Sequence, residues 1–108
     1  MIEKQFIRDE RGERVRVTFT LPDTIWASAI FLVGDFNGWN RTSHPMRQDS
    51  DGRWTLTVDL EPGRAYQFRY LADGEWMNDN QADAYAYNQY GSHNFIVVTD
   101  PAFKQHVE

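Results

Sequence analysis

The segment from Tyr66 to Trp76, YQFRYLADGEW, constrains the fold most, because a strand pattern is followed directly by a tight-turn signal. Aromatic residues alternate with other residues in its first half, and a period of two is typical of a β-strand with one face on a core. Asp73-Gly74 then predicts a chain reversal, because glycine adopts positive φ without steric cost and aspartate can bond its neighbouring backbone. The segment therefore predicts a hairpin that leaves the ring of Trp76 beside the turn and facing solvent.

Four other segments carry strand patterns. Residues 14–20 (RVRVTFT) and 54–60 (WTLTVDL) alternate apolar and polar side chains, as half-buried strands do. Residues 29–34 (AIFLVG) form an apolar run that suits a strand buried on both faces, and residues 93–99 (HNFIVVT) predict a last strand. Turn signals with glycine or proline separate these segments, and no long helical pattern occurs. The sequence predicts an all-β fold, an immunoglobulin-like antiparallel β-sandwich.

The length of 108 residues fits one domain with one core. We place the β-sandwich domain at residues 14–99, after a charged N-terminal lead-in at 1–13 whose structure the sequence does not define. A C-terminal tail at 100–108 follows, in which Asp100-Pro101 could start a short helix. The stretch 77–92 is rich in Asn, Asp and Tyr without a clean period, and it predicts a long loop.

Composition excludes several classes of partner. The net charge of −5 and the pI near 5.1 argue against nucleic acid and against anionic membrane surfaces, which need clustered Lys and Arg. The chain has no cysteine, so disulfides and thiolate metal sites are excluded. Its start is charged, unlike a signal peptide, and no apolar run approaches the roughly 20 residues of a membrane span. These features predict a cytoplasmic protein.

Residues for catalysis or metal binding do not form a recognisable pattern. His44, His93 and His106 lack the serine and acid partners of a nucleophilic triad. A pair of carboxylates for glycoside hydrolysis needs a cleft deeper than so small a sandwich offers. The run from Asn78 to Asp83 lacks the glycine and distal glutamate of a helix-loop-helix calcium loop. We therefore expect no catalytic residue, no metal and no cofactor.

The aromatic content of 15% exceeds what a core of this size usually needs. Trp39 follows an Asn-Gly turn, as Trp76 follows Asp-Gly, and flat rings beside turns can offer apolar area to the CH-rich face of a sugar. Three further rings join them in this interpretation: Tyr85, Tyr87 and Tyr90. The alternative is that Trp39 and Trp76 pack on the edge of the sandwich.

The remaining two tryptophans are assigned structural roles. Trp54 lies on the core face of its predicted strand. Trp26 lies in a short connection before the apolar run, and nothing in its sequence neighbourhood directs it outward.

Three separated motifs resemble carbohydrate-binding module family 48: FLVGDFNGW, EPGRAYQFRYLADGEWMND and QYGSHNFIVV. That family includes the glycogen-binding domain of the AMP-activated protein kinase beta subunit and N-terminal domains of branching and debranching enzymes. The resemblance implies an early-set immunoglobulin-like sandwich that binds α-1,4-glucans such as glycogen, starch or maltodextrin. It also implies an association with glycogen- or starch-metabolising enzymes of glycoside hydrolase family 13.

The resemblance also assigns residues to a carbohydrate site. The two family tryptophans fall on Trp39 and Trp76, and the basic residue on the strand before DGxW falls on Arg69. The apolar residue near the sugar falls on Tyr90, and the amide that bonds hydroxyls falls on Asn94. The family's DP after the second tryptophan reads Asp-Asn here. The alternative function is a sandwich that has lost glucan binding and acts as a protein-interaction or regulatory module for a glycogen-metabolising enzyme.

Overall fold

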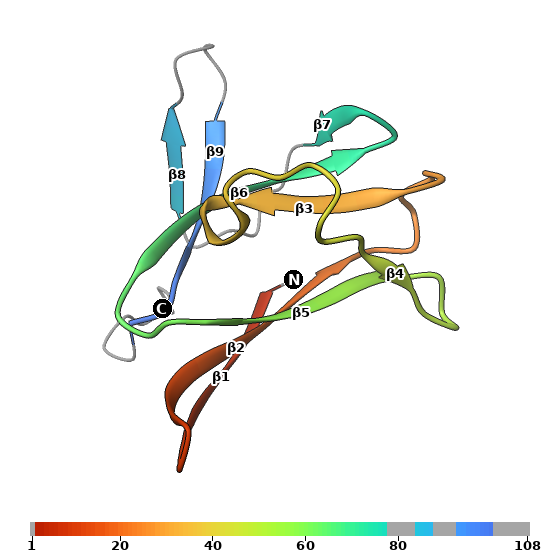
Figure 1. Cartoon of the computed structure of the whole chain (residues 1–108). Coiled ribbons are helices and arrows are strands. Elements are labelled where there is room, and N and C mark those ends of the chain that lie inside the picture. Colours follow the sequence, from red (N-terminus) through yellow and green to blue (C-terminus); the bar gives the residue numbers. More distant parts are fainter. Residues whose placement is uncertain (1, 78–83, 88–92, 101–108) are drawn as a thin grey trace, which may run out of the picture.

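The computed structural model describes residues 2–77, 84–87 and 93–100, which form two antiparallel sheets packed face to face (Figure 1). The first sheet has the order β1 (Ile2–Asp9), β2 (Gly12–Leu21), β5 (Trp54–Leu60) and β4 (Arg47–Gln48). The second has the order β3 (Ile30–Gly34), β6 (Ala65–Ala72), β9 (His93–Val98) and β8 (Ala84–Tyr87), and β7 (Glu75–Met77) also pairs with β6. A 3-10 turn, η1 (Asp35–Asn37), follows β3.

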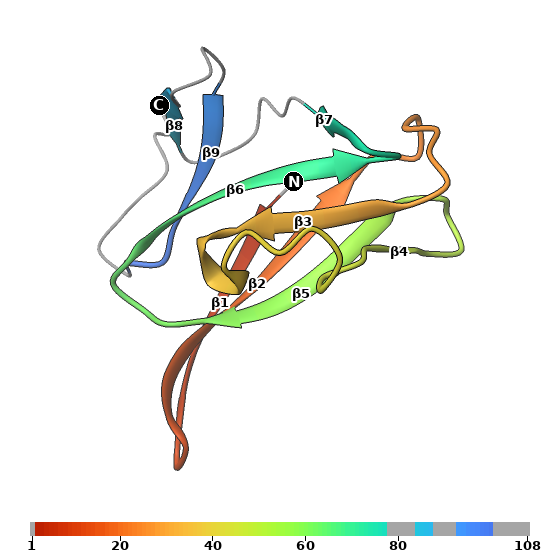
Figure 2. The ribbon, with the colours of Figure 1, turned by 45° about the horizontal axis from the view of Figure 1, so that its top comes forward.

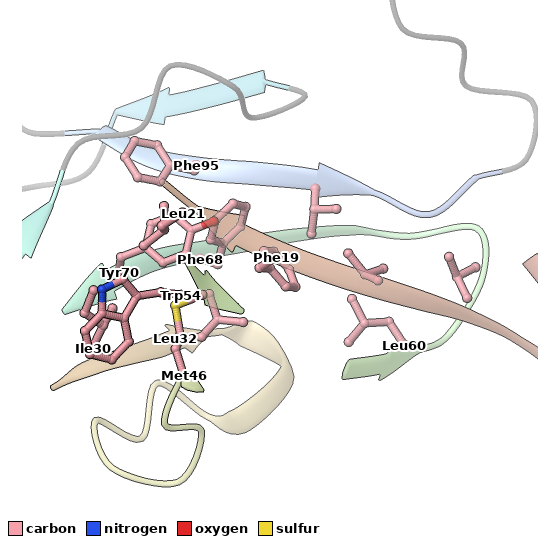
Figure 3. Packing of buried hydrophobic residues seen from close by; sticks show 13 residues of the cluster. Phe19, Leu21, Ile30, Leu32, Met46, Trp54, Leu60, Phe68, Tyr70 and Phe95 are labelled. Atoms are coloured by element: carbon pink, nitrogen blue, oxygen red, sulfur yellow. The ribbon is translucent and has the colours of Figure 1, made fainter. Parts of the chain in front are cut away.

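The core lies between the sheets and follows the predicted alternation (Figure 3). From the first sheet, Phe19 places its ring 5.1 Å from that of Phe68, in an edge-on contact. Phe68 makes similar contacts with Tyr70 and Phe95 in its own sheet. Trp54 is also buried, as predicted. The arrangement confirms the predicted all-β sandwich, because each inner face supplies alternate side chains of its strands to one apolar layer.

Two segments differ from their predicted local structure. Residues 2–9, expected as a lead-in of undefined structure, form strand β1 and pair with β2 along its whole length, from Ile2–Phe19 to Asp9–Gly12. The resulting hairpin extends beyond the rest of the sandwich (Figure 2). The prediction of a continuous loop at 77–92 is wrong for Met77, which ends β7, and for residues 84–87, which form β8 and pair with β9.

Within the described ranges, no helix has the length and apolar character needed to cross a membrane.

Candidate functional site

Strand β6 presents Arg69 on the outer face of the second sheet. Phe68 and Tyr70 are fully buried on the core face, so the side chain between them points to the opposite face. Phe68 pairs with Gly34 of β3 and with Phe95 of β9, which places β3 and β9 on opposite edges of β6. The edge of β6 opposite β3 pairs first with β9, at residues 65–68, and then with β7, at residues 70–72. Arg69 lies between these two pairings.

Trp76 and Asn94 face the same side as Arg69. Trp76 is paired with Leu71, which is two residues from Arg69 and therefore on its face. Asn94 precedes the core residue Phe95 on β9, so its side chain points outward, and its amide donates to the side-chain oxygen of Gln67 at 2.9 Å. The sheet thus gathers a tryptophan, an arginine and an amide at the junction of β7 and β9.

Two guanidinium groups lie close to the ring of Trp76. The guanidinium carbon of Arg69 is 5.1 Å from the ring centroid, and that of Arg41, from the loop after η1, is 5.3 Å away. Such distances permit cation–π attraction, worth about 0.5–1 kcal/mol at exposed sites. Trp76 remains 37% exposed. Because Arg41 and Trp39 belong to the same loop, the contact of Arg41 with Trp76 places this loop beside strand β7.

Asp35 fixes Trp39 to strand β6. One oxygen of its carboxylate accepts the indole N–H of Trp39 at 3.0 Å, and the other accepts the backbone N–H of Gln67 at 2.8 Å. Because the side chain of Gln67 in turn accepts from Asn94, Asp35 and Gln67 together link Trp39 to Asn94. Four of the predicted site residues, Trp39, Arg69, Trp76 and Asn94, thus have identified side-chain contacts.

The backbone of Trp39 adopts a left-handed conformation with φ of 60°, which costs a bulky residue about 1–3 kcal/mol. Its N–H donates to the Gly34 carbonyl at 2.9 Å, which helps to hold this conformation. Asn37 secures the surrounding loop, since its side-chain oxygen accepts from Gly34 and its amide lies within hydrogen-bond distance of the Leu32 and Asn40 carbonyls. The surrounding contacts thus stabilise an otherwise unfavourable placement of the ring.

Replacing Asp35 with alanine should weaken binding of the α-glucan that the family resemblance implies, because the resemblance assigns Trp39 to that site. The variant loses the acceptor of the indole N–H and leaves the N–H of Gln67 without its carboxylate, so we expect about three- to tenfold lower affinity and a stability loss of about 1–2 kcal/mol. Isothermal titration with maltoheptaose and thermal melting would measure the two effects. Asp49→Ala is the matched control, because Asp49 also accepts backbone N–H groups, but in the β4–β5 turn. Equal ligand affinity in both variants would contradict the role of Asp35.

Partial burial lowers the pKa of the Arg69 guanidinium from its ordinary value. An arginine nevertheless stays charged near neutral pH, so the site keeps a fixed cation with planar hydrogen-bond donors. Among the described residues, no group of three or more His, Asp or Glu side chains is arranged to hold a metal ion. This surface presents a flat aromatic ring, cationic hydrogen-bond donors and an amide, and such groups suit a neutral ligand rich in hydroxyl groups.

Two aromatic predictions are corrected by the structure. Tyr85 lies opposite Phe95 in the β8–β9 ladder and makes an edge-on ring contact with it at 5.7 Å, on the face away from Trp76. It therefore does not line the surface that carries Arg69. Trp26, expected in a structural role, is 94% exposed. Tyr90 lies outside the described residues.

Sequence reasoning did not identify Asp35, Gln67 or Arg41. Asp35 precedes Trp39 by four residues inside the GDFNGW motif, and this spacing was the available signal for the indole contact. The other two act across elements far apart in sequence. Their contacts therefore required the three-dimensional fold.

Comparison with known proteins identifies the family. A family profile described as the glycogen recognition site of AMP-activated protein kinase matches residues 15–104. A 1,4-alpha-glucan branching enzyme GlgB of Photobacterium profundum is 38% identical over 81 residues, which cover 72% of this chain and 11% of the enzyme. Protein PTST homolog 2, chloroplastic, of Arabidopsis thaliana is 32% identical over 71% of this chain and 14% of its own length.

Protein FLOURY ENDOSPERM 6, chloroplastic, of Oryza sativa subsp. japonica is 28% identical over 92% of this chain and 19% of its own length. The chain thus spans 11% to 19% of the length of these three relatives. Because the family profile extends over most of the chain, from residue 15 to residue 104, the chain belongs to the glycogen-recognition family of non-catalytic carbohydrate-binding modules, the module family 48 that its motifs resemble.

Proposed function

We propose that this module binds α-1,4-glucans through Trp39 and Trp76. The observation that supports the proposal is the placement of Trp76 and Arg69 together on the outer face of the second sheet, with the indole of Trp39 bonded to Asp35, whose carboxylate also accepts from β6. Membership of the glycogen-recognition family supports an α-glucan as the ligand.

In this mechanism the two indole rings supply apolar area to the C–H faces of neighbouring glucose units. A ring of this kind carries roughly 150–250 Å² of surface, and each Å² removed from water contributes about 25 cal/mol. Rigid-body association and desolvation of hydroxyl groups offset most of that gain. We therefore expect a dissociation constant in the range of about 1 μM to 1 mM, or roughly 4–8 kcal/mol.

Polar groups beside the rings would set the orientation of the sugar. Arg69 is a planar donor suited to pairs of hydroxyl oxygens, and Asn94 can both donate and accept. Gln67 restrains Asn94 through the 2.9 Å hydrogen bond, which limits the rotamers available to that amide. We assign Tyr90 to a further apolar contact on the strength of its position in the family motif alone.

We further infer that the module serves an enzyme of glycogen or starch metabolism, in the same chain or in a partner. The support is that one relative is named a branching enzyme and that the matched segment is a small part of it. In such an arrangement the module holds the enzyme on its polymer, which raises the local concentration of chain ends.

A titration followed by tryptophan fluorescence tests the proposed ligand. We expect a saturable change with maltoheptaose and none with cellohexaose, because a β-linked chain is flat and does not follow the same ring placement. A response to both sugars would contradict α-glucan selectivity. If neither sugar changes the tryptophan fluorescence and glycogen-containing gels do not retard the protein, glucan binding would be contradicted. That result would favour the alternative, a protein-interaction module.

A further inference from the structure

The loop between β2 and β3 carries the most exposed large hydrophobic side chain among the described residues. Trp26 is 94% exposed, whereas Phe6, Tyr85 and Trp76 range from 37% to 47%. Trp26 is one of the residues that line an open groove of about 500 Å³, and the described lining residues are these: Asp23, Ile25, Trp26, Ala27, Ser28, Gln48 and Asp73. The proposed carbohydrate site described above does not use this ring.

The backbone on both sides of Trp26 is fixed to the sandwich. The Ile25 carbonyl accepts the indole N–H of the buried Trp54 at 3.3 Å. The carboxylate of Asp73 accepts the backbone N–H groups of Ser28 and Ala29 at 2.9–3.0 Å, and the Asp73 N–H returns a bond to the Ala29 carbonyl. The ring is thus presented by an anchored loop, which lowers the entropy lost when a ligand orders it.

The groove has the chemistry of a site for a neutral, hydroxyl-rich ligand. Asp23 and Asp73 supply carboxylates, Gln48 supplies an amide held by its bond to the Gly52 carbonyl, and none of the described lining residues is basic. Two carboxylates without a cation disfavour an anionic ligand. One ring among polar groups also falls well short of the apolar patch of several hundred Å² that marks a protein-docking surface.

The groove adjoins the proposed carbohydrate site through one hairpin. Asp73 lies in the β6–β7 turn and Trp76 follows three residues later on β7, so their Cα atoms are at most roughly 10 Å apart. The end of the sandwich that carries Trp26 therefore lies within reach of a polymer that stacks on Trp76.

We propose that Trp26 and its groove form a second glucan-binding subsite, which contacts a further stretch of a polymer already held at Trp39 and Trp76. This inference rests on the proposed function. The ring of Trp26 stacks on a sugar face, while Asp23 and Gln48 accept and donate hydrogen bonds to its hydroxyl groups. Two linked contacts on one polymer raise the apparent affinity without strengthening either contact.

The test compares Trp26→Ala with the unaltered protein on two ligands. We expect retention by glycogen in native affinity electrophoresis to fall about fivefold, while the affinity for maltoheptaose in calorimetry changes less than about twofold. Phe6→Ala is the matched control, because it removes a half-exposed ring of β1 that is not among the residues lining this groove. Gln48→Ala should reproduce part of the loss, and melting curves would confirm that each variant is folded.

Distinct results overturn the two proposals. If Trp26→Ala is retained by glycogen as strongly as the unaltered protein, the second subsite is wrong and the function proposed for Trp39 and Trp76 stands. An equal loss on maltoheptaose would also overturn a second subsite, because it would place Trp26 in the first. If the unaltered protein binds neither ligand, the proposed function fails and this inference fails with it. If only Trp26→Ala loses glycogen binding while Trp76→Ala keeps it, Trp26 is a glucan contact and the first site is wrong.

Discussion

Replacing Trp76 with alanine should reduce the affinity for maltoheptaose at least about tenfold while the sandwich stays folded. At most the exposed 37% of Trp76, roughly 55–90 Å², can contact a sugar, and losing that area at about 25 cal/mol per Å² removes roughly 1.4–2.3 kcal/mol, a factor of about ten to fifty. Trp76 is 37% exposed on a three-residue strand and is not part of the buried cluster. Its removal therefore costs the fold two cation–π contacts, about 1 kcal/mol, and the packing of the covered part of its side chain, but it leaves the cluster between the sheets intact.

Calorimetry measures this loss without relying on the fluorescence of the ring that is removed. Phe6→Ala serves as the control, because Phe6 is 47% exposed and lies in the first sheet, away from Arg69. Trp76→Phe should retain part of the affinity, since a smaller ring keeps some stacking area. Normal binding by a folded Trp76→Ala variant would show that this ring does not contact the glucan.

The strands that the sequence predicts well are those whose two faces differ in chemistry. In β2 and β5 the alternation is regular, because one face meets the core and the other meets water. Strand β1 lacks such a face, since its residues are half-buried or exposed at the sheet edge, and its pattern resembles a solvated tail. Strand β8 is short and contains alanine at alternate positions, and alanine is depleted in strands.

The candidate site was predictable where one hairpin positions a residue and unpredictable where distant segments do. Trp76 and Arg69 share the β6–β7 hairpin, so turn chemistry and alternation place them together. The bond from Asp35 to Gln67 spans 32 residues, and the bonds from Asp73 to the Trp26 loop span about 45 residues. Loop residues have no periodicity to reveal which face they occupy, which is why the exposure of Trp26 was not predicted.

Gly34→Ala should be among the most destabilising substitutions in the chain, at about 3 kcal/mol. Gly34 is extended, with φ of −174°, so the cost is one of space and not of backbone conformation. A Cβ there would lie 2.5 Å from the Gln67 carbonyl oxygen and 2.9 Å from the Phe68 Cβ. Because these atoms belong to the backbone and the first side-chain carbon of β6, they can yield only if β3 and β6 move apart.

The comparison with Gly63→Ala isolates this close approach. Gly63 has φ of 76°, and no atom lies within 4 Å of the position that an added methyl group would take, so alanine there should cost only the conformational strain, about 1 kcal/mol. Urea unfolding of both variants measures the difference, and a Gly34→Ala loss no larger than that of Gly63→Ala would contradict the steric argument. Separating β3 from β6 would also pull Asp35 away from the Gln67 N–H, so Gly34→Ala should weaken glucan binding as well. The first glycine of GDFNGW thus couples the stability of the sandwich to the placement of Trp39.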